Sequence, residues 1–232
     1  MQNRVAVITG GLGVLGRAVA TAFTAAGYRV AVLDRVAATA EDRRAGGNAV
    51  LLIDGIDLTD TVATKSAIDS VVARFGALDV LVNVAGGFRW QLFTDTDLAV
   101  WDLMYNMNLK SALVVTHTAL PHLTRSASGR IVNIGAGAAA AKAASGMGAY
   151  TAAKAGIQKL TESLADELKD RGICVNAILP GTLDTPQNRV DMPTADHARW
   201  VAPADLAAVV LFLASTEARA VNGAALAVAG RA

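Results

Sequence analysis

The sequence predicts an α/β fold in which a parallel β-sheet is covered by helices on both faces. Short apolar runs alternate with longer helical patterns along the chain. The runs are rich in Val and Ile and apolar almost throughout, which is typical of strands that are buried on both faces. This alternation indicates a parallel sheet whose strands are connected by helices.

Seven apolar runs are the expected strands, and five longer patterns between them are the expected helices. The strands lie at residues 4–8, 29–33, 49–53, 78–82, 130–134, 173–178 and 224–228. The helices span about residues 14–26, 60–75, 97–123, 149–170 and 203–214. Asp and Thr residues precede the second helix, and Pro203 falls in the first turn of the last, where proline is tolerated.

The bulk composition favours one globular domain over residues 1–232. The chain is 53% hydrophobic and 18% charged, so it can bury a substantial core. The Pro- and Asp-rich stretch around 181–200 is the longest irregular segment, and we expect it to form a lid over the substrate.

Several classes of protein are disfavoured. The net charge of +1 gives no electrostatic case for a nucleic-acid partner. No apolar run reaches the roughly 18 residues of a membrane span, and the N-terminus shows no signal-peptide pattern. Cys174 has no second cysteine to pair with, and His117, His122 and His197 lack metal-ligand spacing. We expect a cytoplasmic protein without a metal site.

A glycine-rich turn, "TGGLGVLG", follows the first strand. Gly10, Gly13 and Gly16 would let the backbone approach a pyrophosphate, and the next helix would direct its N-terminal N–H groups at that anion. Alone, the pattern also fits an ordinary turn. The candidate residues are Gly10, Gly11, Leu12, Gly13, Leu15 and Gly16.

Acidic side chains follow the second and third strands. Asp34 lies 18 residues after Gly16, close to the offset of an acid that binds the adenosine ribose hydroxyls, although it could also be a loop or capping acid. A carboxylate there repels a 2′-phosphate and favours NAD(H), whereas Arg35 leaves NADP(H) open. Asp57 and Leu58 are candidates for the adenine contact.

The stretch "VNVAGG" follows the fourth strand and ends at the same edge of the sheet. Asn83 can hold neighbouring strand ends together, while Ala85 and Gly86 leave room for a cofactor.

Tyr150 and Lys154 are four residues apart on one face of a helix. A carbonyl or imine that accepts a hydride must also gain a proton, which a Tyr can donate if its pKa is brought nearer to neutral. The Lys154 ammonium and an oxidised nicotinamide would supply the required field. Without its context this pair would be read as a helical surface pair.

These stretches, with "NMNLKSA", "GRIVNI", "AYTAAKAGI" and "VNAILPGTLDTP", resemble the short-chain dehydrogenase/reductase family over nearly the whole chain. The resemblance implies a single-domain, doubly wound Rossmann fold with strand order 3-2-1-4-5-6-7. It implies that Tyr150 is the catalytic acid/base, that Lys154 holds the nicotinamide ribose, and that Asn108 anchors a proton relay. It also implies cofactor contacts from Pro180, Gly181, Thr182 and Thr185, and a homodimer or homotetramer.

The sequence departs from the family pattern at one catalytic position. The family serine should fall on Ala136 or Gly137; Ser145 belongs to the following loop, although it could stand in for that serine. The same replacement is found in the dihydropteridine reductase-like subgroup, which "GAGAAAAKAASGMGAYTAAKAG" resembles most. That subgroup reduces a conjugated ring, for which one Tyr donor can suffice.

The substrate side is less specific. Phe88 and Trp90 could stack on a flat ring or simply pack against the next helix. Arg189 could bind an anionic substrate, although an exposed lid salt bridge is favoured. The candidate substrate residues are Phe88, Trp90, Ala136, Met147, Leu183 and Arg189.

Three functions follow from these patterns. The first is an NAD(P)(H)-dependent reductase of a C=O or C=N in a small, cyclic or conjugated substrate. The second is a general carbonyl reductase or secondary-alcohol dehydrogenase, such as a 3-oxoacyl thioester reductase. The third is a non-catalytic dinucleotide-binding scaffold.

Overall fold

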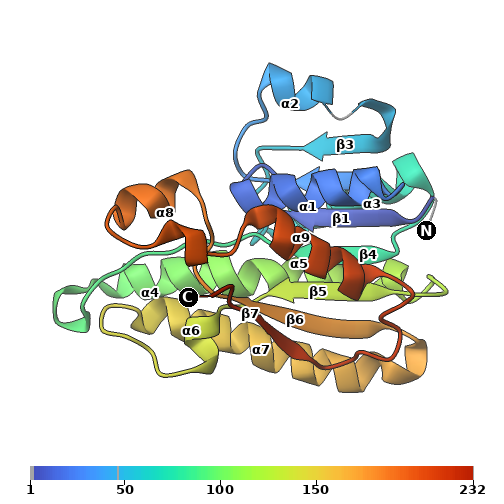
Figure 1. Cartoon of the computed structure of the whole chain (residues 1–232). Coiled ribbons are helices and arrows are strands. Elements are labelled where there is room, and N and C mark those ends of the chain that lie inside the picture. The colour runs from blue at the N-terminus through green and yellow to red at the C-terminus, as the bar shows by residue number, and fades with distance from the viewer. Residues whose placement is uncertain (1–2, 46, 232) are drawn as a thin grey trace.

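The computed structural model describes residues 3–45 and 47–231 and contains one seven-stranded parallel sheet (Figure 1). The strand order is β3-β2-β1-β4-β5-β6-β7, as the family resemblance implied. The strands are β1 (Val5–Thr9), β2 (Arg29–Leu33), β3 (Val50–Ile53), β4 (Val80–Asn83), β5 (Arg130–Ile134), β6 (Cys174–Pro180) and β7 (Ala225–Val228). All seven predicted strands are confirmed to within two residues at each end.

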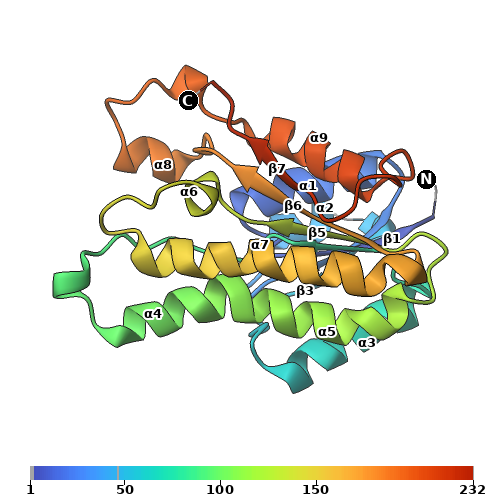
Figure 2. The same cartoon turned by 90° about the horizontal axis from the view of Figure 1, so that it is seen from below.

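Helices cover both faces of the sheet (Figure 2). The α-helices are α1 (Val14–Ala25), α2 (Ala40–Ala45), α3 (Thr61–Phe75), α4 (Leu98–Tyr105), α5 (Ser111–Leu123), α6 (Gly137–Ala140), α7 (Gly148–Leu168), α8 (Pro186–Asp191) and α9 (Pro203–Ala214). Helices α3, α5 and α7 pack in one core, and α1 and α9 pack in the other. Both cores are largely aliphatic, with Phe75 in one and Phe23 and Tyr28 in the other, because the strands between them are apolar on both faces.

Two features differ from the predicted elements. The single helix expected over 97–123 is interrupted by a π-helical segment, Asn106–Lys110, which separates α4 from α5. The short helices α2, α6 and α8 were not predicted, because each has only four to six residues and too little periodicity to detect. None of the helices in the described part of the chain is long and apolar enough to cross a membrane.

Candidate active site

The glycine-rich turn connects the end of β1 to α1. Gly10 has a φ of +62°, and a Cβ there would lie 2.8 Å from the Cα of Ala85. A Cβ on Gly16 would collide with the carbonyl oxygen of Gly10. Glycine at these positions is therefore required by the fold itself. At Gly13 a Cβ would contact only the Gly10 carbonyl oxygen, at 3.3 Å, so the turn is open on this side.

The open side of the turn leads to the start of α1, a helix of 12 residues. Its first N–H groups have no partner within the helix and lie at the positive end of the helix dipole. Leu15 is buried and contributes to the core rather than to the surface of the turn. The geometry therefore fits an anion bound by the backbone from Gly13 onwards.

Asp34 ties the end of β2 to this turn. One carboxylate oxygen accepts a hydrogen bond from the N–H of Leu12 at 2.9 Å, and the other accepts from the N–H of Val36 at 2.9 Å. The side chain is mostly buried. Each carboxylate oxygen can accept further bonds, so the position remains compatible with ribose hydroxyls.

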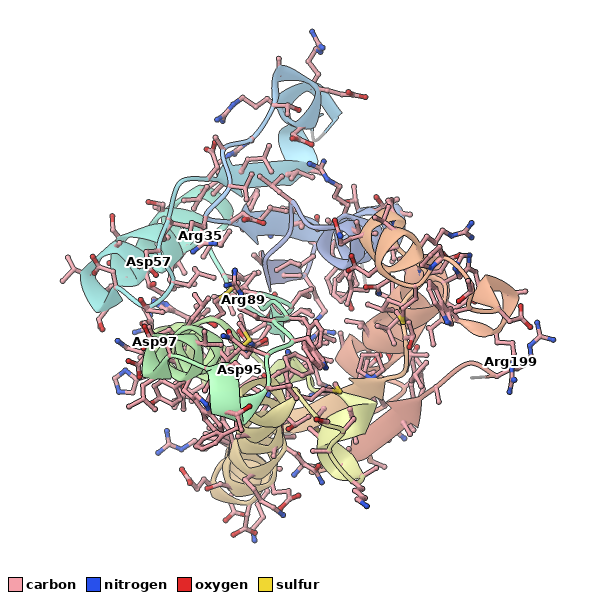
Figure 3. The ribbon with its side chains drawn as sticks, turned by 90° about the vertical axis from the view of Figure 1, so that its left-hand side faces the viewer. Arg35, Asp57, Arg89, Asp95, Asp97 and Arg199 are labelled. Atoms are coloured by element: carbon pink, nitrogen blue, oxygen red, sulfur yellow. The ribbon has the colours of Figure 1, made fainter. Side chains whose placement is uncertain are left out.

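Arg35 and Asp57 lie near one another on the carboxyl edge of the sheet, which faces the viewer in Figure 3. Both are exposed. The pKa of Asp57 is lowered, chiefly because the backbone N–H and hydroxyl of Thr59 donate to its carboxylate, with a smaller contribution from Arg35. Leu58 is buried in the core, so its side chain is not available to an adenine ring.

Asn83 belongs to a buried row of polar side chains that crosses the sheet. Its amide nitrogen donates to Thr116 of α5 at 3.0 Å and to Asn133 of β5 at 2.8 Å. Asn133 in turn donates to Thr161 of α7 at 2.9 Å. The structure thus assigns Asn83 the strand-holding role rather than an exposed cofactor contact, and it adds partners that the sequence reading missed. A polar residue inside an apolar strand, as in "RIVNI", was the available signal.

Asn108, Lys154 and Gly86 converge below the turn. A Cβ on Gly86 would lie 2.6 Å from the Asn108 amide oxygen and 3.3 Å from the Lys154 Nζ. The side chain of Asn108, in the π-helical segment, accepts from the Gly87 N–H at 3.1 Å and donates to the Gly87 carbonyl at 3.0 Å. The Lys154 ammonium donates to the Ile134 carbonyl at 2.7 Å. Helical π segments are frequent at functional sites.

Burial controls the ionisation of the two candidate catalytic groups. It lowers the pKa of Lys154 to about 8 and raises the pKa of the Tyr150 phenol. The expectation that Lys154 lowers the Tyr150 pKa is therefore not met by the protein alone, because desolvation dominates at Tyr150. At neutral pH the phenol is protonated and is a proton donor.

The end of β6 and the residues that follow it carry four more of the predicted cofactor contacts. Pro180 closes the strand, and a Cβ on Gly181 would lie 2.9 Å from the Ala229 carbonyl oxygen. Thr185 caps α8 by accepting from the Asn188 N–H at 3.1 Å. The carbonyl of Thr182 accepts from the Val201 N–H at 2.9 Å.

The residues at the position of the family serine, Ala136 and Gly137, lie close to the end of β6. Ala136 is buried, and a Cβ on Gly137 would lie 3.1 Å from the Pro180 carbonyl oxygen. Such a contact is tighter than ordinary packing, so a larger residue at Gly137 would require β6 to move slightly. The small residues are thus part of a close contact between the two loops.

The aromatic candidates adopt different roles. Phe88 packs edge-on against Tyr150, with ring centroids 5.0 Å apart. Trp90 lies on Gly146, and its indole N–H donates to the Ser145 carbonyl at 2.9 Å. Phe88 therefore contacts the candidate catalytic residue Tyr150, whereas Trp90 connects its own loop to the loop that contains Ser145.

The remaining substrate candidates are engaged within the protein. Arg189 forms a bidentate ion pair with Asp184, which is the exposed lid salt bridge favoured from sequence. Leu183 forms a β-bridge with Val201. The carbonyl of Met147 accepts from the Thr151 N–H at the start of α7. Among the described residues, no group of three or more His, Cys, Asp or Glu side chains could hold a metal ion.

Comparisons with known proteins agree on one family. The family model for short chain dehydrogenase matches residues 4–195. The chain is 34% identical to (2S)-[(R)-hydroxy(phenyl)methyl]succinyl-CoA dehydrogenase subunit BbsD of Thauera aromatica, over 99% of this chain and 96% of that protein. It is also 34% identical to the 3-oxoacyl-[acyl-carrier-protein] reductase FabG of Staphylococcus aureus, over 96% of this chain and 95% of that protein.

A solved structure shares the fold. Carveol dehydrogenase from Mycobacterium avium, in complex with NAD, superposes with a TM-score of 0.89 and 28% identity, over 99% of this chain and 97% of that one.

Proposed function

Because the chain belongs to the short-chain dehydrogenase family, we propose that it is an NAD(H)-dependent oxidoreductase that interconverts a carbonyl group and a secondary alcohol in a small substrate. The observation that carries the proposal is the convergence of Lys154 and Asn108 beside Gly86, one helical turn from Tyr150. These side chains adjoin an open glycine turn, as a hydride-transfer site requires.

The described residues fit a dinucleotide. The backbone from Gly13 into α1 would hold the pyrophosphate, Asp34 the adenosine ribose, and Lys154 the nicotinamide ribose. NAD(H) is favoured because Asp34 places a carboxylate at the ribose position, and because the similar carveol dehydrogenase was solved with NAD. When bound, the cofactor supplies or accepts the hydride.

The chain's own residues supply the proton. In the reducing direction Tyr150 donates its phenol hydrogen to the carbonyl oxygen, which becomes the alcohol hydroxyl, and its raised pKa keeps that hydrogen in place at neutral pH. The Lys154 ammonium stabilises the phenolate that this transfer leaves. In the oxidising direction Tyr150 must first be ionised, so that direction requires alkaline conditions or a positive charge in addition to Lys154.

A second candidate function is reduction of a quinonoid dihydropterin. It is favoured by Ala136 and Gly137, which place no hydroxyl where an isolated carbonyl would be polarised. A conjugated ring spreads the charge that the hydride delivers and needs fewer donors.

Steady-state assays with NADH and NADPH test both candidates. The panel should contain acetoacetyl thioesters, simple cyclic ketones and quinonoid dihydropterin. Turnover of ketones or thioesters supports the main proposal, and selective turnover of the pterin supports the second. Tight NADH binding without turnover of any compound would contradict both.

The proposal includes self-association as a dimer or tetramer and a cytoplasmic location. Large apolar side chains are exposed on α4, α9 and β7, namely Leu103, Tyr105, Phe212 and Leu226. Sedimentation of the purified protein would decide the oligomeric state.

A further inference from the structure

A cavity of about 370 Å³ lies between the β4–α4 connection, the first turns of α4 and the segment that leads into α7. Its volume is within the range of small-molecule sites. Its walls are Arg89, Gln91, Leu92, Phe93, Thr96, Val100, Trp101, Ala144, Ser145, Gly146, Gly148 and Ala149.

Three of the cavity walls are neighbours, along the chain, of Tyr150 or of Phe88, which contacts Tyr150. Gly148 and Ala149 directly precede Tyr150 on α7, and Arg89 directly follows Phe88, whose ring contacts that of Tyr150. A substrate that places its carbonyl at Tyr150 could therefore extend another part of its structure into the cavity.

The walls are held in place. The Gln91 N–H donates to the Gly146 carbonyl at 2.9 Å, next to the bond between the Trp90 indole and the Ser145 carbonyl. These two bonds join the loop that carries Arg89 to the loop that precedes α7. The site is thus largely formed before a ligand arrives, which reduces the entropy lost on binding.

Arg89 is the only ionisable side chain among the cavity walls, and it makes no ion pair with the described residues. The carboxylate of Asp97 in the same connection accepts from the Ala99 N–H and caps α4. Figure 3 shows Arg89 on the carboxyl-edge face, between Arg35 and Asp95. Arg189, the cation suggested from sequence, is bound to Asp184.

We propose that Arg89 binds an anionic group, such as a carboxylate, at the end of the substrate remote from the reacting carbon. A guanidinium matches a carboxylate in two parallel hydrogen bonds. Phe93 and Trp101 provide an apolar wall for the body of the substrate. Their rings pack edge to face, with centroids 6.1 Å apart. The substrate class is then an oxo acid or hydroxy acid. This inference rests on the proposed function.

Matched acid and ester pairs test the proposal. The probes are 5-oxohexanoate with methyl 5-oxohexanoate, and 4-acetylbenzoate with methyl 4-acetylbenzoate, in which the carboxylate is remote from the reacting carbonyl, each reduced with NADH. The wild type should favour each acid over its ester by about tenfold or more in kcat/KM. Arg89→Met should remove this preference, raising the KM for the acids much more than the KM for the esters, which it should still reduce. Lys142→Met, which removes an exposed cation outside the cavity, should retain the preference.

The outcomes distinguish the role of Arg89 from the oxidoreductase activity itself. Ester turnover by Arg89→Met shows that oxidoreduction is intact, so an unchanged acid preference in that variant overturns the role of Arg89 alone. A wild type that favours the esters also overturns it. If none of the four compounds is reduced, calorimetric titration with benzoate decides: binding to wild type but not to Arg89→Met supports the role of Arg89, and equal or undetectable binding overturns it.

Discussion

Replacement of Thr161 by Val tests how the fold positions α7, the helix that carries the candidate catalytic residues. Thr161 lies seven residues, or two helical turns, after Lys154 on the same face of α7. Its hydroxyl accepts from the Asn133 amide, and Asn133 directly precedes Ile134, whose carbonyl accepts from Lys154. Helix α7 is thus fastened to β5 at two successive residues.

The cost of Thr161→Val follows from burial. Val preserves the shape of Thr, so the change leaves the Asn133 amide donor without a partner at a position with 0% exposure. An unsatisfied buried donor costs about 1–3 kcal/mol. Rotation of the Asn133 amide cannot compensate, because its oxygen already accepts from Asn83. For a chain of this length the melting temperature should fall by about 2–12 °C.

Thr161→Ser is the matched control, since it keeps the hydroxyl and removes one buried methyl group, worth about 1 kcal/mol. Urea unfolding gives both stabilities, and steady-state assays well below the transitions give kcat and KM. We expect Thr161→Val to lose more kcat than Thr161→Ser, with NADH affinity nearly retained. Wild-type stability and kcat in Thr161→Val would refute the positioning argument.

Three other substitutions or conditions test separate parts of the site. Asp34→Ala should raise the KM for NADH about tenfold and reduce the preference for NADH over NADPH, because it removes the proposed acceptor for the ribose hydroxyls; a wild type that already prefers NADPH would contradict this. Since the pKa of Lys154 is about 8 and its ammonium is the active form, kcat/KM for NADH should be flat below pH 8 and fall about tenfold per pH unit above it; a profile that stays flat to pH 10 would argue against Lys154. Gly137→Ser should raise kcat/KM for an isolated ketone by tenfold or more at some loss of stability, because the new side chain crowds the Pro180 carbonyl; unchanged ketone activity would show that the missing serine does not limit the reaction.

The strands and long helices could be predicted because they depend on local patterns. Continuous Val- and Ile-rich runs identify strands buried on both faces, and all seven were correct. The π-helical segment at Asn106–Lys110 could not be predicted, because it depends on the bonds that Asn108 makes with Gly87, a residue distant in the sequence. Strand order came from the family resemblance and not from periodicity.

The motifs predicted which residues meet at the candidate site, but not the contacts that they make there. The structure brings four predicted features together at the carboxyl edge of the sheet: the glycine turn, Asp34, Lys154 and Asn108. The raised pKa of Tyr150 was missed because it reflects burial, which the spacing to Lys154 does not reveal. The exposure of Arg89 to a cavity likewise depends on tertiary packing, whereas the ion pair between Arg189 and Asp184 is local and was favoured from the sequence.

The central claim is that the Tyr150 hydroxyl transfers the proton that accompanies hydride transfer. The most direct measurement is the turnover of Tyr150→Phe with the best substrate of the panel, alongside NADH affinity from fluorescence quenching. The account predicts a loss of about a hundredfold or more in kcat with unchanged NADH affinity. A rate close to that of the wild type would contradict it.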